Sequence, residues 1–328
     1  MNDILAKDLS DFALSDYIRK AYSVGPLIYM PGLREDIAEK LADFGEYPHL
    51  SAALCLEDTV RDDMVEEAEK NIAAQLKRLK RSAGERRLPM VFIRVREPRQ
   101  VPQMTELLGE GAELVSGFII PKIDDVVFAD YMEVIRGTDK YFMPIIENPS
   151  LVNVCGRAEK LGALYGQMLS VKEKILNVRV GGNDFSGSLG LRNRIDQTIY
   201  DLYPIMGLLS DIAAVFTKDF VVSAPVWNYF DSGSDGRWLS GMRREMDRDR
   251  AMGFVGKTII HPSQIAPAAE FMKVSREDYE DAVLLVKTRG SELRVVKSSS
   301  GGRMCEHAVH MKWAEKILAL ASIYGVRE

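Results

Sequence analysis

Residues 143–149, Met-Pro-Ile-Ile-Glu-Asn-Pro, decide the fold class of this chain. A short apolar run ends on the carboxylate of Glu147, and Pro149 follows where a turn into a helix would begin. A run of this length bounded by a helix breaker is typical of a buried strand. Because a parallel α/β barrel carries its chemistry at the C-terminal ends of its strands, Glu147 is the first candidate site residue.

Residues 178–184, Val-Arg-Val-Gly-Gly-Asn-Asp, repeat this design and place Asp184 at the tip of the next strand. Two carboxylates at the tips of consecutive strands can share one hard cation, which prefers oxygen ligands and retains several waters. Taken singly, the two residues are equally well explained by a helix cap at Glu147 and a glycine turn around Asp184. Together they favour a metal site, and the hardness of the ligands favours Mg²⁺, with Mn²⁺ as the alternative.

The rest of the chain supplies enough strands for a closed sheet. Helical patterns separate them, for example over residues 151–165, 195–216 and 236–252. Eight buried strands that alternate with helices predict a parallel (β/α)₈ barrel, the TIM barrel, rather than an open sheet. The other predicted strands are residues 26–31, 54–58, 89–95, 116–122, 220–225 and 254–262.

We expect three segments along the chain. Residues 1–25 form an N-terminal helical extension, and residues 26–290 hold the barrel with its trailing helices. Residues 291–328 form a linker and a C-terminal helix, an appendage that could fold over a barrel mouth. Within it, residues 297–302, Lys-Ser-Ser-Ser-Gly-Gly, have the composition of a flexible linker.

Composition excludes several classes of protein. Of the 328 residues, 46% are hydrophobic and 28% are charged, which is typical of a soluble globular protein. The net charge of −5 argues against a nucleic-acid partner or an anionic membrane surface, and no apolar run is long enough to span a bilayer. The N-terminus lacks the pattern of a signal peptide, and three widely spaced cysteines argue against a disulfide framework. We expect a cytoplasmic protein.

Three further charged residues fall at or near predicted strand ends: Glu57, Arg94 and Lys122. In a barrel these ends converge on one face. The fork of Arg94 suits a substrate carboxylate. Such a site suits a 2-oxo acid or an acyl group, because a metal can polarise the carbonyl and stabilise an enolate formed by carbon–carbon cleavage or proton abstraction.

The glycines around Asp184 do not form the G-x-G-x-x-G dinucleotide pattern, so we reject a Rossmann interpretation. A glycine-rich loop that lets the backbone approach a ligand, or a simple turn, explains them. These glycines are Gly181, Gly182, Gly187 and Gly190.

Several short segments of the chain follow one family pattern in order: residues 29–32, 54–60, 93–95, 120–122, 146–147, 182–185, 189–190 and 256–264. They resemble the citrate lyase beta-subunit-like family of the HpcH/HpaI aldolase superfamily. The ending at residues 302–306 is similar to that family's Gly-x-Met-x-Asp tail, with Glu306 in place of the aspartate. The resemblance covers most of the chain from residue 26 onward.

The resemblance implies a TIM barrel in which Glu147 and Asp184 hold Mg²⁺ and Arg94 binds the substrate carboxylate or carbonyl. It implies that Glu57 and Asp58 support the waters of the metal. It also implies a homotrimer or hexamer in which the C-terminal segment can complete a neighbour's site. Related enzymes, such as citryl-CoA and malyl-CoA lyases, cleave or form bonds between acetyl-CoA or pyruvate units and 2-oxo acids.

Three positions depart from the family pattern. Cys55 replaces an acid in the usual Leu-Asp-Leu-Glu-Asp, and Arg96 replaces the asparagine of Arg-Val-Asn, which places a second cation near the site. Glu306 keeps the tail carboxylate but moves it by one methylene, which matters for proton transfer. A divergent branch found in bacterial stress and tellurite-resistance gene clusters, thought to cleave carbon–carbon bonds, is similar in these departures.

The leading hypothesis is a Mg²⁺-dependent carbon–carbon lyase that joins or separates an enolisable acyl unit, acetyl-CoA or pyruvate-like, and a 2-oxo acid. A class II pyruvate aldolase that uses no CoA and a non-catalytic scaffold subunit of a biosynthetic complex are the alternatives. Catalysis is expected from Arg94, Glu57 and Glu306. Metal binding is expected from Glu147 and Asp184, with Asp58 in contact with the waters of the metal. Substrate contacts are expected from Arg94, Lys122, Gly182 and Pro225.

Overall fold

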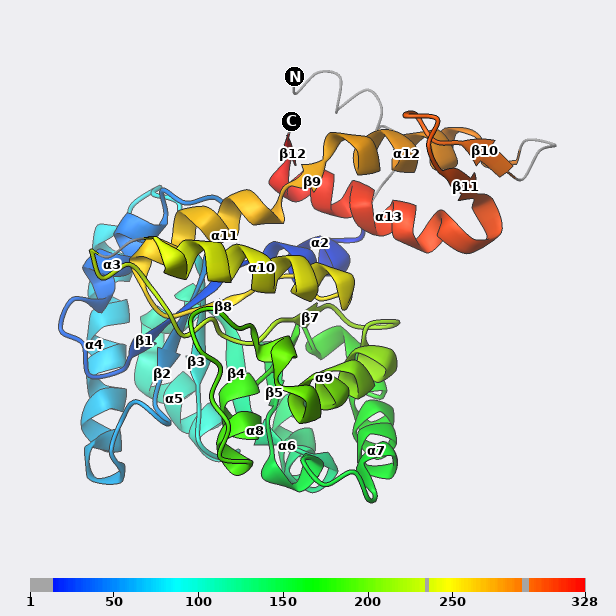
Figure 1. The fold of residues 1–328 in the computed structure, drawn as a ribbon. Helices are drawn as coiled ribbons and strands as arrows, with labels where there is room; N and C mark the ends of the chain where they lie inside the picture. Colours follow the sequence, from blue (N-terminus) through cyan, green and yellow to red (C-terminus); the bar gives the residue numbers. More distant parts are fainter. Residues whose placement is uncertain (1–13, 234–235, 291–294, 328) are drawn as a thin grey trace. The chain divides into compact units, whose positions relative to one another are not determined.

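The computed structural model describes residues 14–233, 236–290 and 295–327. It divides into two compact units, each of which is described here by itself. The barrel unit spans Val24–Ala268, and the second unit combines Met1–Ser23 with Ala269–Glu328. Figure 1 shows the eight strands of the barrel unit with helices around them.

The barrel unit contains one eight-stranded parallel sheet, in the order β7-β6-β5-β4-β3-β2-β1-β8. A parallel bridge between Ala224 and Lys257 joins β7 to β8, so the sheet curves back on itself. The predicted TIM barrel is therefore confirmed. The strands are β1 (Leu27–Pro31), β2 (Ser51–Cys55), β3 (Met90–Arg94), β4 (Val115–Ile123), β5 (Tyr141–Ile146), β6 (Val178–Val180), β7 (Val222–Ser223) and β8 (Thr258–Ile259).

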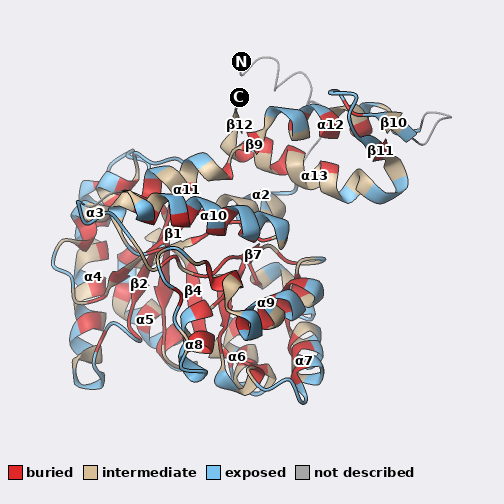
Figure 2. Ribbon diagram, viewed as in Figure 1, coloured by how far each residue is buried: buried red, intermediate tan, exposed pale blue. Residues whose placement is uncertain are grey.

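Amphipathic helices cover the sheet, with buried faces towards the strands and exposed faces outward (Figure 2). Helix α4, for example, buries Ile72 and Leu76 while Glu66 and Lys70 remain exposed. Its apolar residues recur at helical spacing, which explains why this charged segment packs on a barrel. The helices are α3 (Ile37–Phe44), α4 (Val65–Ser82), α5 (Gln100–Leu108), α6 (Asp125–Gly137), α7 (Arg157–Leu169), α8 (Gly182–Ser188), α9 (Tyr203–Phe216) and α10 (Arg237–Ala251), and α11 (Ile265–Met272) spans the boundary between the units.

Strand register brings the candidate side chains to one end of the barrel. Cys55 lies opposite Arg94 between β2 and β3, and Ile146 pairs with Val180 between β5 and β6. The C-terminal ends of these strands are therefore level. The residues that follow them, including Glu147, share one face as the sequence predicts.

In its described part, the second unit includes the helices α2 (Asp16–Ser23), α12 (Arg276–Lys287) and α13 (His307–Tyr324). Leu285 of α12 and Leu318 of α13 are buried in the same apolar cluster, so α12 groups with the C-terminal helix and not with the barrel. The division at residue 268 thus differs from the expected segment boundary at 290. The first 13 residues of the expected N-terminal helix lie outside the described part of the chain.

The expected flexible linker at residues 297–302 instead belongs to a β-hairpin. Strands β10 (Val295–Lys297) and β11 (Met304–Glu306) pair antiparallel, and the Ser298 N–H donates to the Arg303 carbonyl at 2.8 Å. Arg303 Nε in turn donates to Asp281 Oδ2 at 2.6 Å, which fixes the hairpin against α12. Short parallel strands β9 (Val274–Ser275) and β12 (Val326–Arg327) complete this unit. Among the residues described, no helix combines the length and the apolar character that crossing a membrane requires.

Candidate active site

Arg94, the last residue of β3, lies at the centre of a cluster of charged side chains. Its Nη2 contacts Glu57 Oε2 at 2.6 Å, Asp58 Oδ2 at 3.1 Å and Glu147 Oε1 at 2.9 Å. Arg94 and Glu147 are both buried. The three carboxylates come from the segments that follow β2 and β5, so the barrel topology brings to Arg94 residues from distant parts of the chain, including Glu147, which is 53 positions away.

Lys122 joins the same cluster from β4. Its Nζ lies 2.6 Å from Glu57 Oε1 and 2.7 Å from Asp58 Oδ1, and its backbone N–H donates to Glu147 Oε1 at 3.2 Å. The residue has a φ of 50°, a left-handed conformation that is unusual for a side-chain-bearing residue. Partial burial opposes the charge on Lys122, but hydrogen bonds to Asp58 and Glu57 raise its pKa. Its ammonium group is therefore already occupied by carboxylates.

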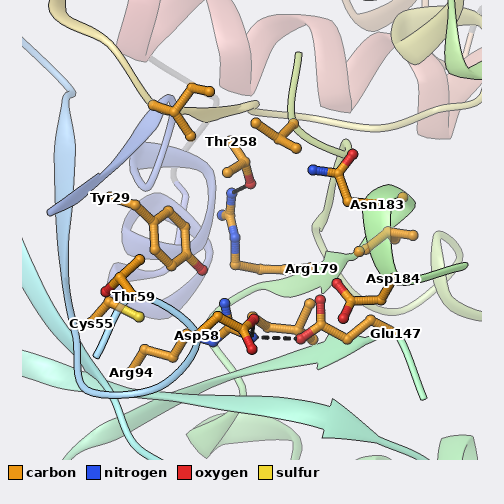
Figure 3. A pocket seen from close by; sticks show the side chains of 16 residues that line it. Tyr29, Cys55, Asp58, Thr59, Arg94, Glu147, Arg179, Asn183, Asp184 and Thr258 are labelled. Carbon is orange, nitrogen blue, oxygen red and sulfur yellow. Dashed lines mark hydrogen bonds and ion pairs between the residues drawn. The ribbon is translucent and has the colours of Figure 1, made fainter. Parts of the chain in front are cut away.

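Glu147 and Asp184 point towards each other across the mouth of the barrel (Figure 3). Burial, together with the neighbouring charge of Asp184, raises the pKa of Glu147 to about 8, although Arg94 opposes the shift. Apart from the hydrogen bond that Glu147 and Asp184 share with each other, no N–H or O–H group of the described chain donates to Glu147 Oε2 or to the carboxylate of Asp184. These oxygens are the ones that a cation could take.

The backbone beside this pair leaves room for the carboxylates. A Cβ atom on Gly181 would lie 2.1 Å from Glu147 Oε2. Only glycine therefore lets the backbone at residue 181 come so close to the Glu147 side chain. The expected glycine loop is in fact the start of helix α8, whose first turn carries Asp184. Gly182 is buried there, and a Cβ on it would lie 2.9 Å from Pro225 Cβ.

The cluster has an excess of negative charge. Two cations, Arg94 and Lys122, face four carboxylates, those of Glu57, Asp58, Glu147 and Asp184. When all four carboxylates are ionised, the surplus of two negative charges equals the charge of a divalent cation. Within the ranges that the structure describes, no three or more His, Cys, Asp or Glu side chains are placed to hold one metal ion together. Mg²⁺ is commonly bound through one or two carboxylates, with waters and substrate oxygens as the other ligands, so the donor set fits such an ion.

A pocket of about 290 Å³ opens beside these groups. Arg94, Asp58, Glu147, Gly182 and Asp184 all line it, as expected for site residues. Glu57, Lys122 and Pro225 are not among these lining residues, although Glu57 contacts Arg94 and Lys122 contacts Asp58, so the roles expected for them stay predictions.

Sequence reasoning assigned no role to Arg179 or Tyr29, which also line the pocket. Arg179 lies in the middle of β6 and is 1% exposed. Its Nη2 donates to Thr258 Oγ1 at 2.5 Å, and its burial, which a hydrogen bond to Tyr29 partly offsets, lowers its pKa. The signal for Arg179 was a charged residue inside an otherwise apolar strand.

Arg96 does not act as the expected second cation near the site. Its guanidinium turns to the segment between β2 and α4, where Nε donates to the Leu56 carbonyl at 2.6 Å. Nη2 donates to the carbonyls of Glu57 and Val60. Arg96 thus holds the backbone that carries Glu57 and Asp58.

Glu306 belongs to the second unit, at the end of β11, where its backbone N–H donates to His310 Nδ1 at 2.9 Å. Its assignment to catalysis therefore stays a prediction.

The model of a family described as C–C bond lyases of the TIM-barrel fold matches residues 18–326. The chain belongs to this family. The expected enzyme class, a carbon–carbon lyase, is confirmed at the level of the family, as is the resemblance to the citrate lyase beta-like enzymes.

Curated relatives carry related names. The chain is 26% identical over 267 residues to the L-malyl-CoA/beta-methylmalyl-CoA lyase of Rhodobacter capsulatus, which covers 74% of this chain and 77% of that protein. It is 32% identical over 133 residues to the mitochondrial citramalyl-CoA lyase of Homo sapiens. That match covers 40% of this chain and 34% of the human protein, so it spans about a third of that relative's length.

Solved structures share the fold. The protein CitE from Mycobacterium tuberculosis, in complex with magnesium, acetoacetate and coenzyme A, aligns with a TM-score of 0.60 at 19% identity over 91% of this chain and 98% of that one. A citrate lyase from Burkholderia xenovorans LB400 aligns with a TM-score of 0.69 at 14% identity over 92% and 93%.

Proposed function

We propose that this protein cleaves or forms a carbon–carbon bond between an enolisable acyl unit and a 2-oxo acid, with a divalent cation, best Mg²⁺, between Glu147 and Asp184. The observation that supports it most is the pair itself. Two carboxylates face each other at the barrel mouth, one of them buried with its pKa raised to about 8, and neither has a full set of donors from the protein. A cation would bind the carboxylate oxygens that no protein donor occupies.

Glu147 and Asp184 would hold the cation, and Gly181 gives the Glu147 carboxylate the space to turn towards it. When bound, the cation would act as a Lewis acid towards the substrate carbonyl. The magnesium in the CitE complex is consistent with a divalent ion in a barrel of this fold. Mn²⁺ is the alternative ion, because it accepts the same oxygen ligands.

Arg94 would bind and orient the substrate. Its Nη2 is held by three carboxylates, whereas its buried Nε has no acceptor in the described chain. A buried donor without a partner is costly, so a substrate oxygen that accepts from Nε stabilises the complex. This contact would fix a substrate carbonyl or carboxylate beside Glu147.

Glu57 and Lys122 would act as positioning residues. Glu57 bridges Arg94 and Lys122, and Asp58 contacts the same two cations. Four ion pairs among four side chains restrict the rotamers of Arg94, and fixed dipoles and charges are what catalysis by electrostatic stabilisation requires. Asp58 also lines the pocket, where it is placed to accept hydrogen bonds from waters of the cation.

The acyl unit is proposed to be a CoA thioester, because the curated relatives are named as lyases of CoA esters. If so, CoA raises the thermal midpoint of the protein, since a ligand of the native state stabilises it. No effect of CoA would favour the pyruvate-type aldolase. Glu306 as acid/base and assembly into a homotrimer or hexamer are further parts of the proposal.

The test is proton–deuterium exchange in D₂O, followed by NMR. Metal-free protein is mixed with Mg²⁺ and, in turn, with acetyl-CoA, propionyl-CoA, pyruvate and 2-oxobutanoate. We expect exchange at the α-carbon of at least one compound, and we expect it to stop when a chelator is added.

Two variants make the test specific to the site. Glu147→Gln should abolish the exchange, whereas Glu159→Gln, which alters an exposed carboxylate on α7, should leave it unchanged. Exchange that persists in Glu147→Gln, or in the presence of chelator, would contradict the proposed metal site.

A further inference from the structure

The pocket is lined by two arginines that differ in their partners. Arg94 forms ion pairs with three carboxylates. Arg179 forms none with any described residue: its contacts are Thr258 Oγ1 at 2.5 Å, Asn177 Oδ1 at 3.4 Å and the hydroxyl of Tyr29. These partners are neutral side chains, and the carboxylate of Glu147 acts on the charge of Arg179 only through space, without an ion pair.

The guanidinium of Arg179 is also incompletely hydrogen-bonded. Its Nε is buried without an acceptor in the described chain, and the whole residue is 1% exposed. Water therefore solvates only a small part of this charge, at the wall of the pocket, and burial lowers the pKa of Arg179. A buried charge without a partner destabilises a fold by several kcal/mol, so proteins seldom retain one without a use for it.

The position of Arg179 shows what could pair with it. It lies on the wall of the pocket, one strand from Glu147, with Tyr29 and Thr258 beside it (Figure 3). Those two hydroxyl groups can donate to an oxyanion at the same place. A guanidinium flanked by hydroxyl groups is a typical arrangement for a carboxylate or a phosphate.

We propose that Arg179 binds a second anionic group of the oxo-acid substrate, so that the 2-oxo acid is a dianion and not a simple monocarboxylate such as pyruvate or glyoxylate. The inference rests on the proposed function, because the first carboxylate and the keto group are those that the cation and Arg94 would hold. It adds the class of substrate. With a pocket of about 290 Å³, the acid is small.

The test compares acids of matched length by isothermal titration calorimetry in Mg²⁺, without turnover. One pair is 2-oxoglutarate against 2-oxopentanoate, which differ in a second carboxylate. The other is 3-phosphonopyruvate against 2-oxobutanoate, which differ in a phosphonate. We expect one dianion to bind at least about tenfold more tightly than its monoanionic partner, since a hydrogen-bonded charge pair is worth that much. A preference within the first pair would identify the second anionic group as a carboxylate, and a preference within the second pair would identify it as a phosphoryl-type group.

Two variants assign the preference to this residue. Arg179→Gln should reduce the ratio of affinities within the pair to about one, and Arg179→Lys should restore a part of it. Glu147→Gln should weaken both members of the pair and leave their ratio unchanged. A role of Arg179 in stability alone would lower the denaturation midpoint without a change in the ratio.

The outcomes separate the two proposals. If neither dianion is preferred by the wild-type protein, or if Arg179→Gln retains the preference, the assignment of Arg179 is wrong, whatever the exchange experiment gives. If α-carbon exchange is absent but the preference exists and depends on Arg179, the acid site is supported and the lyase proposal fails.

Discussion

The barrel unit contains two clusters of charged side chains that differ in how completely their polar groups are hydrogen-bonded. The pocket cluster consists of Arg94, Lys122, Glu57, Asp58, Glu147 and Asp184. The sealed cluster consists of Lys257, Glu245, Asp249 and Tyr200, and its Lys257 and Glu245 side chains have no exposed surface. Both combine buried cations with carboxylates in the same unit, yet only the first borders a pocket among those described.

The sealed cluster is complete. Lys257 Nζ donates to Glu245 Oε1 at 2.6 Å and to Asp249 Oδ2 at 2.9 Å. The remaining carboxylate oxygens accept from the Ile199 N–H and from the Tyr200 hydroxyl. Every carboxylate oxygen therefore has a donor, and the network fixes α10 against the residues just before β8.

In the pocket cluster, both acceptors and donors of hydrogen bonds lack partners. Beyond the hydrogen bond that they share, Glu147 Oε2 and the Asp184 carboxylate receive no donor from the described chain, and Arg94 Nε lacks an acceptor. Buried polar groups are normally paired, so missing partners beside a cavity indicate that a ligand supplies them. The difference that bears on ligand binding is thus completeness, because every carboxylate oxygen of the sealed cluster has a donor and those of the pocket cluster do not.

The largest expected effect is on the sealed cluster. Lys257→Met would leave two buried carboxylates without their cation, which costs about 3–5 kcal/mol of the free energy of unfolding. Urea denaturation followed by circular dichroism would show a much lower midpoint. The control is Lys70→Met, which removes an exposed lysine paired with Glu66 and should change little. Equal midpoints for the two variants would remove the distinction between the clusters.

Glu147→Gln should act in the opposite way. We expect the affinity for Mg²⁺ or Mn²⁺ to fall on the order of a hundredfold or more, because even the partners of metal ligands contribute ten- to hundredfold. The urea midpoint of the metal-free protein should change little at pH 7, because the carboxyl group of Glu147, with its pKa raised to about 8, is mostly protonated there and the amide replaces a neutral group. Calorimetry and denaturation test this, with Glu159→Gln as the control. A large loss of stability with intact metal binding would make Glu147 structural.

The pH dependence of metal binding follows from the raised pKa of Glu147, about 8. Below that pH the carboxyl group of the metal-free protein is protonated, and the cation must displace the proton. The affinity should therefore rise by up to about tenfold per unit between pH 6 and pH 8 and level off above that range. An affinity that is constant over this range, measured in buffers of equal ionic strength, would show that Glu147 is not a ligand.

Arg96→Met should have the smallest effect. It removes hydrogen bonds to the carbonyls that precede Asp58, and we expect a loss of about 1–2 kcal/mol in stability. Hydrogen–deuterium exchange by mass spectrometry should be faster over residues 56–62. Arg99→Met, which alters an exposed arginine paired with Glu97, is the control. Unchanged exchange would mean that Arg96 does not hold this segment.

The pocket cluster could be predicted from sequence because the barrel topology determines which strand ends lie next to each other. Once residues 143–149 and 178–184 are recognised as consecutive strands, chain order alone places Glu147 near Asp184 at the same end of the sheet. The same holds for Arg94 and Lys122, which are strand residues.

Properties that depend on side-chain direction could not be predicted in this way. The isolation of Arg179 depends on Tyr29 and Thr258, which come from β1 and β8 at the other end of the sheet order. Arg96 differs from expectation because it turns to backbone carbonyls. The hairpin at residues 295–306 has linker-like composition, and its structure depends on an ion pair between Arg303 and the distant Asp281.

The most direct measurement is the anomalous diffraction of crystals grown with Mn²⁺. We predict one strong peak in the barrel, with Glu147 and Asp184 as its protein ligands and Arg94 beside it. A barrel without such a peak, or a peak bound elsewhere, would contradict the claim that the incomplete cluster is a cation site.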